Sequence, residues 1–256
     1  MIKSRLSKAL GATVLGLAAA TTAQAELVTF EDVTPSLYTS GDTFTSGSFT
    51  FGVSSPYGPG FLDGQIDTSA AYFFGNAPTN ALGQFYGGLN DSSVTMTGGA
   101  VGLFTIKSFD IAFIPVIPGF YLPGELPGRI IASFIDANGA AGSESFEFGA
   151  SDAFGTFAFG TVPATGGLAG ALQSLTFTAC VYEFGACVNP GFNLAQFALD
   201  NIDAEVPEPT SLALVALALV GEMPDLLAGE PGHEANVPRN LRILADGVDR
   251  LHVEAC

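Results

Sequence analysis

The sequence has no tryptophan and only two histidines, His233 and His252, which both lie in the last 24 residues. Charged residues make up 13% of the 256 residues, about half of the quarter that is usual in soluble domains. Without histidine, the first 232 residues cannot build a Ser-His-Asp triad, a Cys-His pair or a histidine metal site. The most familiar forms of hydrolytic and zinc chemistry are therefore excluded from the main part of the chain.

Basic residues are also scarce. Between Glu26 and Val206 only Lys107 and Arg129 are basic, against 17 acidic residues, which gives this part a net charge of −15. Binding to nucleic acid requires several cationic side chains that neutralise a row of phosphates. The sequence therefore predicts no nucleic-acid partner.

What is present is a large apolar and glycine-rich fraction, with 48% hydrophobic residues, 22 phenylalanines and 32 glycines. Short apolar runs alternate with Gly, Pro, Ser and Asp breaks between residues 26 and 205, and Ser174–Thr178 shows the period of two that is typical of a half-buried strand. This pattern predicts an all-β fold, an antiparallel β-sandwich with jelly-roll-like topology over residues 26–205. The expected strands are 27–33, 48–53, 70–74, 93–97, 101–113, 130–136, 143–148, 154–159, 172–181 and 193–202.

The first 25 residues have the three parts of a secretory signal peptide. Lys3, Arg5 and Lys8 precede the apolar run 9–20, and Ala23 and Ala25 form an A-x-A cleavage site. We therefore expect a signal helix that is removed, a mature chain that begins at Glu26, and export from the cytoplasm.

A second sorting element lies near the other end. Val206, Pro207, Glu208 and Pro209 are followed at once by the apolar run 212–220. This arrangement resembles the C-terminal signal of PEP-CTERM proteins, which are exported by Gram-negative bacteria that make exopolysaccharide. The resemblance implies an exosortase-type sorting protease as partner, and a place at the cell surface, in the outer membrane or in the extracellular matrix.

The sequence departs from the family pattern after the motif. The predicted apolar helix over 206–221 has a run of only nine apolar residues, whereas a membrane span needs about 20. Residues 222–256 form an acidic tail instead of an arginine cluster. Two explanations stay open, a shift of reading frame near Gly221 and a natural soluble tail, and both limit this chain to transient membrane association.

Acidic residues stand where the first and last strands of the body are expected. In jelly-roll carbohydrate-binding modules, such acids often share one structural Ca²⁺, and Phe197–Ile202 resembles the closing strand of such a module. Ca²⁺ takes six to eight oxygen ligands, carboxylates among them. We expect Glu31 and Asp200 to be Ca²⁺ ligands, with solvated strand ends as the simpler alternative.

Two of the three cysteines, Cys180 and Cys187, are separated by six residues. In an exported protein this spacing predicts a disulfide that closes a short loop. Two reduced, buried cysteines are the alternative, and Cys256 has no evident partner in the chain.

Taken together, these features predict a non-enzymatic exported protein of the cell surface or extracellular matrix, associated with exopolysaccharide. The alternative is a carbohydrate-binding β-sandwich, and a secreted glycoside-acting enzyme is less favoured because no pattern singles out a carboxylate pair. In the alternative, exposed tyrosines would stack against sugars, the candidates being Tyr38, Tyr57, Tyr72, Tyr86 and Tyr121. The repeated Phe-x-Phe, as in Phe49-Thr-Phe51, is better explained by strand positions that face the core.

Overall fold

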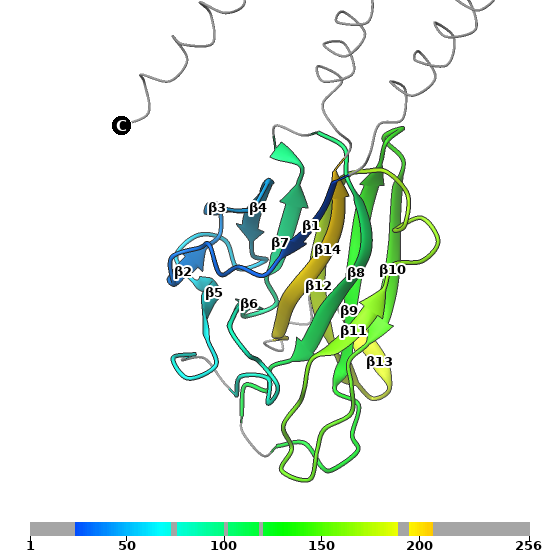
Figure 1. Ribbon diagram of the computed structural model, residues 1–256. Helices are drawn as coiled ribbons and strands as arrows, with labels where there is room; N and C mark the ends of the chain where they lie inside the picture. Colours follow the sequence, from blue (N-terminus) through cyan, green and yellow to red (C-terminus); the bar gives the residue numbers. More distant parts are fainter. Residues whose placement is uncertain (1–23, 73–75, 100–101, 118–119, 189–194, 207–256) are drawn as a thin grey trace, which may run out of the picture. The chain divides into compact units, whose positions relative to one another are not determined.

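Two antiparallel β-sheets form the body of the protein in a computed structural model (Figure 1). The structure describes residues 24–72, 76–99, 102–117, 120–188 and 195–206, which belong to one compact unit, Ala20–Thr210. The expected signal helix and apolar helix, the motif residues Pro207, Glu208 and Pro209, and the 222–256 tail lie outside the described residues.

The first sheet has the strand order β11-β8-β14-β6-β5-β2, and β1 pairs with β14. Its strands are β1 (Gln24–Val28), β2 (Ser36–Thr39), β5 (Leu62–Thr68), β6 (Gln84–Gly88), β8 (Thr105–Phe113), β11 (Gly160–Pro163) and β14 (Phe197–Val206).

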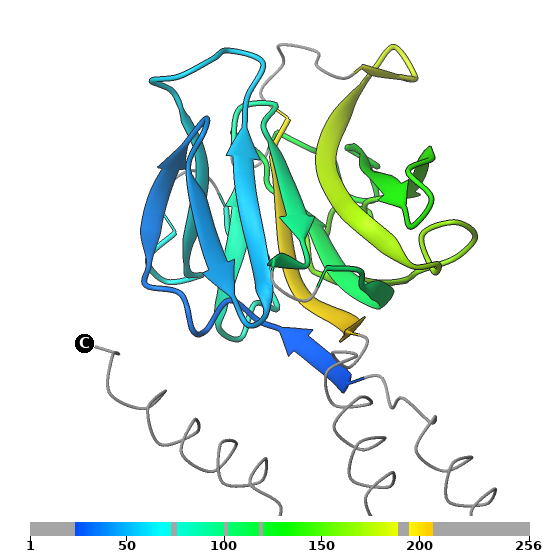
Figure 2. The same cartoon turned by 90° about the horizontal axis from the view of Figure 1, so that it is seen from above.

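The second sheet has the order β10-β9-β12-β7-β4-β3, and β13 pairs with β12. Its strands are β3 (Thr43–Ser46), β4 (Phe49–Ser54), β7 (Ser93–Thr97), β9 (Gly128–Asp136), β10 (Ala141–Glu147), β12 (Leu172–Glu183) and β13 (Ala186–Val188). Figure 2 shows the strong curvature of β12. The chain crosses repeatedly between the two sheets, so the predicted all-β sandwich is confirmed.

The core lies between the sheets and is unusually rich in phenylalanine. Phe49 and Phe51 are both fully buried, which confirms that their Phe-x-Phe pattern faces the core. Phe109 of the first sheet meets Phe177 of the second edge to face, with ring centroids 5.0 Å apart. Edge-to-face pairs add to the stabilisation that comes from burial alone.

The first and last strands of the body pair with each other. Gln24 lies opposite Val206 and Val28 opposite Ile202, so β1 runs alongside β14 (Figures 1 and 2). The strands thus extend slightly beyond the expected limits of 26 and 205. The predicted cleavage after Ala25 would remove the first two residues of β1 and leave three register pairs.

Two of the expected strands are wrong. Residues 70–72 form a turn, in which the N–H groups of Ala71 and Tyr72 both donate to the carbonyl of Thr68. Residues 154–159 do not join a sheet either, because the Asp152 carboxylate accepts the N–H groups of Phe154 and Thr156. Tyr72, Phe157 and Phe159 pack against rings of the first sheet without adding a strand.

Six strands, β2, β3, β5, β6, β11 and β13, were not expected from the sequence. Two of them, β5 and β6, contain Gly64, Gly87 and Gly88 at places where large side chains lie against the backbone. A Cβ on Gly64 would lie 2.7 Å from the Tyr86 hydroxyl oxygen. No helix of the described residues has the length and apolar character of a membrane span.

Candidate functional site

The outward face of the second sheet is rich in hydroxyl groups. Alternate residues of its strands point away from the core, and the ones that do so are partly or fully exposed. We call this surface the hydroxyl face, and its hydroxyl-bearing residues are Thr43, Thr45, Thr50, Ser54, Ser93, Thr95, Thr97, Ser133, Ser143, Ser145, Ser174, Thr176 and Thr178.

The strand register aligns these hydroxyls in rows across the sheet. One row runs through Thr95, Thr176, Ser133 and Ser143, each on a neighbouring strand. Within this row the Thr95 and Thr176 hydroxyls lie 2.8 Å apart and share a hydrogen bond. Each hydroxyl can both donate and accept, so the row retains capacity for a ligand beyond its internal bonds.

A shallow groove of about 400 Å³ lies at one side of the hydroxyl face. Its lining combines hydroxyl groups with the apolar Ile135 and Phe134, and consists of Ser133, Phe134, Ile135, Ala141, Gly142, Ser143, Ser174 and Thr176. Apolar surface with a few placed polar groups is the usual composition of a site for a small molecule or a sugar.

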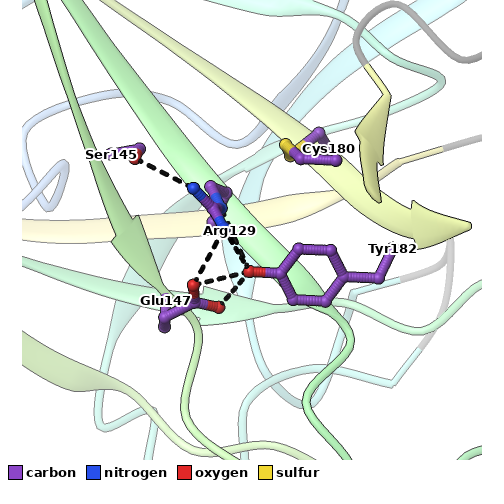
Figure 3. A network of polar contacts seen from close by, with 6 residues as sticks. Arg129, Ser145, Glu147, Cys180 and Tyr182 are labelled. Atoms are coloured by element: carbon purple, nitrogen blue, oxygen red, sulfur yellow. Dashed lines mark hydrogen bonds and ion pairs between the residues drawn. A yellow bond between two sulfur atoms is a disulfide. The ribbon is translucent and has the colours of Figure 1, made fainter. Parts of the chain in front are cut away.

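Among the outward residues of the second sheet's described strands, the only charged side chains stand at one corner of this face, where Arg129 meets Glu147 (Figure 3). The Arg129 guanidinium lies 3.2 Å from the Glu147 carboxylate and donates to the Tyr182 hydroxyl, which in turn donates to Glu147. The guanidinium also lies 5.3 Å from the centre of the Tyr182 ring. Since each charge has an opposite partner, the hydroxyl face as a whole is close to neutral.

The cysteines close the hairpin beside this corner. Cys180 and Cys187 form a disulfide with a Cα–Cα distance of 5.6 Å, which confirms the predicted pairing. The bond connects β12 to β13 beside Tyr182, which follows Cys180 by two residues and lies opposite Cys187, and so restrains the end of the strand that carries this ring.

A second candidate site is an acidic cavity of about 410 Å³ beside the first sheet. It is lined by both predicted calcium ligands, Glu31 and Asp200, together with Asp110, and also by Thr29, Asn80, Ala81, Leu82, Gly83, Phe159 and Asn201. Sequence reasoning thus correctly expected Glu31 and Asp200, which are 169 residues apart, to lie near each other. It missed Asp110, because the outward position of this residue on β8 follows only from the register with β14.

Most oxygens of these three carboxylates are already bonded. Asp110 accepts from the Thr161 hydroxyl and from the Asn201 amide, and Glu31 accepts from the backbone N–H of Gln84. Burial, with smaller contributions from Asp110 and Glu31, raises the pKa of Asp200 to about 7. Among the described residues, no group of three or more His, Cys, Asp or Glu side chains is arranged to hold a metal ion. The calcium ligation by Glu31 and Asp200 therefore stays a prediction.

Two of the five tyrosines predicted to stack on sugars are wrong, because Tyr38 and Tyr86 are buried in the core, where Tyr86 is 0% exposed. Tyr57, Tyr72 and Tyr121 are partly exposed, and sugar stacking by them stays a prediction. Tyr72 packs on Phe85, Tyr121 packs on Phe113, and Tyr57 donates a hydrogen bond to Asp91. The tyrosine on an open face is Tyr182, which the period of two along Thr176, Thr178 and Cys180 would have identified.

No protein-family model matches this chain, and no curated protein is similar to it in sequence. Among solved structures, the chain is similar to a DUF4465 family protein from Bacteroides caccae, with 13% identity, a TM-score of 0.49, and coverage of 72% of this chain and 100% of that one. It is also similar to the CBM22-1 xylan-binding domain of Paenibacillus barcinonensis Xyn10C (12%, TM-score 0.32, 75% and 99% covered). A third is TmCBM61 in complex with β-1,4-galactotriose (12%, TM-score 0.32, 60% and 86% covered). Likenesses this distant assign neither a family nor a ligand to the chain.

Proposed function

We propose that this is an exported, non-enzymatic protein of the cell surface or extracellular matrix, whose body binds polysaccharide through the hydroxyl face. The observation that carries the proposal is the array of aligned serine and threonine hydroxyls on an open, nearly neutral sheet. Sugar hydroxyls need partners that both donate and accept, and these side chains supply such partners. Because the array has almost no charged side chains, an uncharged glycan can bind to it without desolvating charged groups.

The hydroxyl face also offers apolar contact. Ile131 and Ile135 lie among the hydroxyls on β9, and the Tyr182 ring lies at the corner. The ring is held by Arg129 and Glu147, so its orientation is fixed before a ligand arrives. Preorganised contacts lose less conformational entropy on binding.

Export and sorting belong to the same proposal. The Cys180–Cys187 disulfide suits an oxidising compartment outside the cytoplasm. Since β14 ends at Val206, the Pro207–Pro209 segment follows the last strand directly. An exosortase-type protease could therefore cleave there and release the body without cutting any described strand.

A second candidate function rests on the acidic cavity. Asp200, whose pKa is raised to about 7, and Glu31 could serve as acid and base of a glycoside-acting enzyme. Hydrolysis of a bound glycan that disappears in Asp200→Asn would support this candidate and would contradict the non-enzymatic proposal.

Binding of the full chain to insoluble xylan, β-1,4-galactan and the host's own exopolysaccharide tests the proposal. Thr176→Arg places a long charged side chain in the middle of the hydroxyl face and is expected to weaken binding at least about tenfold, or about 1.4 kcal/mol. Thr68→Arg, an exposed threonine on the first sheet, is the matched control and should bind like the wild type. Equal binding by both variants, or no binding to any of these polymers, would contradict a glycan-binding role for this face.

A further inference from the structure

Asp63, in β5, is a buried carboxylate that lacks a hydrogen-bond partner. Its side chain is 0% exposed, and among the described residues neither carboxylate oxygen has a hydrogen-bond partner. The backbone carbonyl of the same residue is well satisfied, since it accepts from the Leu89 N–H at 2.9 Å and from the Ser92 hydroxyl at 2.6 Å. A buried ionised carboxylate is very unfavourable unless a positive charge or several donors compensate it.

No cationic side chain in the described part of the chain compensates Asp63. This part contains two basic residues, Lys107 and Arg129. Lys107 is paired with Glu205 at the edge of the body, and Arg129 is paired with Glu147 on the hydroxyl face. A compensating charge for Asp63 must therefore come from a bound cation or a proton.

Two polar groups from neighbouring loops, the Ser55 hydroxyl and the Ser40 N–H, lie close to the Asp63 carboxylate. Burial raises its pKa, and the Ser55 hydroxyl and the Ser40 amide, which lie close enough to offset part of this rise, do not complete a hydrogen bond with it. The Tyr86 hydroxyl is also fully buried without a partner, and the Asp63 charge raises its pKa further. Two neutral hydroxyls thus accompany one carboxylate with free lone pairs.

A second carboxylate belongs to the same neighbourhood. Asp91 directly precedes Ser92, whose hydroxyl bonds the Asp63 carbonyl, and the Asn90 amide donates to the Leu62 carbonyl at 2.8 Å. Asp91 is 2% exposed and accepts from the Tyr57 hydroxyl and from the Ala195 N–H. The β6–β7 turn therefore holds a second buried carboxyl group next to the strand that carries Asp63.

We propose that Asp63 anchors a buried Ca²⁺ site, completed by hydroxyl and carbonyl oxygens of the loops that follow β2, β4 and β6. Carboxylates together with neutral oxygens are the ligands that Ca²⁺ prefers, and its flexible coordination of six to eight oxygens tolerates ligands from several loops. Neutral oxygens can supply most of the ligands, so such a site needs only one or two carboxylates and no cluster of three acidic side chains. It is separate from the acidic cavity, which none of these residues lines.

Tyrosine-sensitised terbium luminescence of the full chain tests the site, because Tb³⁺ replaces Ca²⁺ and the protein has no tryptophan. The Tyr86 hydroxyl lies against the backbone of Gly64, the residue after Asp63, whereas no tyrosine lines the acidic cavity. The wild type is expected to show saturable emission that excess Ca²⁺ displaces. Asp63→Asn should abolish it, and the control Asp67→Asn, which removes another carboxylate of the same strand, should leave it unchanged.

Thermal unfolding gives a second readout. About 1 mM Ca²⁺, within the range of weak extracellular sites, should raise the Tm of the wild type and of Asp67→Asn, relative to EDTA, by more than that of Asp63→Asn. If Asp63→Asn does not fold, Ser55→Ala should still bind Tb³⁺, with several-fold lower affinity. The proposal is overturned if wild-type emission and Tm do not respond to either metal, which would indicate a protonated Asp63. It is also overturned if Asp200→Asn, rather than Asp63→Asn, loses the response.

Discussion

The outward faces of the two sheets differ in what lies on them. On the first sheet, Phe85, Ala112, Ile114 and Ala198 are buried under loop residues that include Tyr72, Ala77, Ala81 and Phe159. On the second sheet, the outward positions carry partly or fully exposed hydroxyl groups. Part of the first sheet is therefore covered on its outer face, whereas the hydroxyl face of the second sheet is open to a ligand.

This difference is visible in the burial patterns of the strands. In the first sheet, β6 has four consecutive buried residues from Phe85 to Gly88. In the second, β7 alternates strictly, with Val94 and Met96 buried between partly exposed Ser93, Thr95 and Thr97. A strand that is covered on both faces loses its period of two, and a strand with one open face keeps it.

The largest expected effect comes from breaking the covered face. Phe85→Ala should destabilise the protein by about 3–5 kcal/mol, because it leaves a cavity between the first sheet and its loop cover. Ile131→Ala on the open face should cost less than about 1 kcal/mol, since Ile131 is partly exposed already. Urea unfolding of both variants measures the difference. If both variants lose a similar free energy of unfolding, the loop cover contributes no more to stability than the open face does.

A pH effect is expected at the acidic cavity beside the covered sheet. Because burial raises the pKa of Asp200 to about 7 from an unfolded value near 4, the folded state binds the proton more tightly. In EDTA, this contribution to stability is therefore complete below about pH 4 and is lost as the pH rises through 7. The variant Asp200→Asn should lack this decline, and the difference between the two urea-unfolding profiles isolates Asp200 from Glu31 and Asp110.

If Glu31 and Asp200 bind Ca²⁺, the expected dependence of stability on pH is reversed. A metal ion requires deprotonated ligands, so a bound Ca²⁺ would make wild-type stability rise with pH between 4 and 7. A wild-type profile that is the same with Ca²⁺ and with EDTA, but differs from that of Asp200→Asn, would contradict ligation at this cavity.

The comparison of sheets also explains how much of the fold could be predicted from the sequence. The alternation in Ser174–Thr178 predicted β12 and, with it, the open sheet. By contrast, β5 (LDGQIDT) and β6 (QFYGG) have glycines where neighbouring rings pack, and polar residues that are nevertheless buried. Phe85 of β6 is buried under Tyr72, Ala77 and Ala81, and no local pattern predicts that these residues cover a sheet.

The candidate sites were predictable to a similar degree. The disulfide and the meeting of Glu31 with Asp200 followed from short-range spacing and from strands expected at the two ends of the body. Sequence reasoning did not single out Asp63. The residue is notable because its carboxylate is buried without a hydrogen-bond partner among the described residues, and only the three-dimensional structure shows this. The hydroxyl rows depend on the register of five strands, which also lies beyond local patterns.

A smaller effect is expected from loosening the loop cover. The Asn80 side chain accepts the Phe159 N–H at 2.6 Å and donates to the Phe159 carbonyl at 3.2 Å, and so joins the loop to the segment before β11. Asn80→Ala should cost about 1–2 kcal/mol, because two hydrogen bonds are lost. Hydrogen exchange should increase in loop 76–83 and remain unchanged in β12. Unchanged exchange in that loop would mean that apolar packing alone holds it in place.

The smallest effect on stability, and the sharpest on function, is expected from removing hydroxyls on the open face. Thr95 and Thr176 bond each other, so the double variant Thr95→Val with Thr176→Val removes both partners and preserves shape. The free energy of unfolding should change by less than about 0.5 kcal/mol, since no buried polar group loses its partner. If the hydroxyls bind glycan, affinity for the polysaccharide identified with the wild type should nevertheless fall several-fold. Retained affinity for the glycan would indicate that Ile135 and the Tyr182 ring, and not these hydroxyls, make the main contact. A large loss in the free energy of unfolding would show that the open face, like the covered one, contributes to the stability of the sandwich.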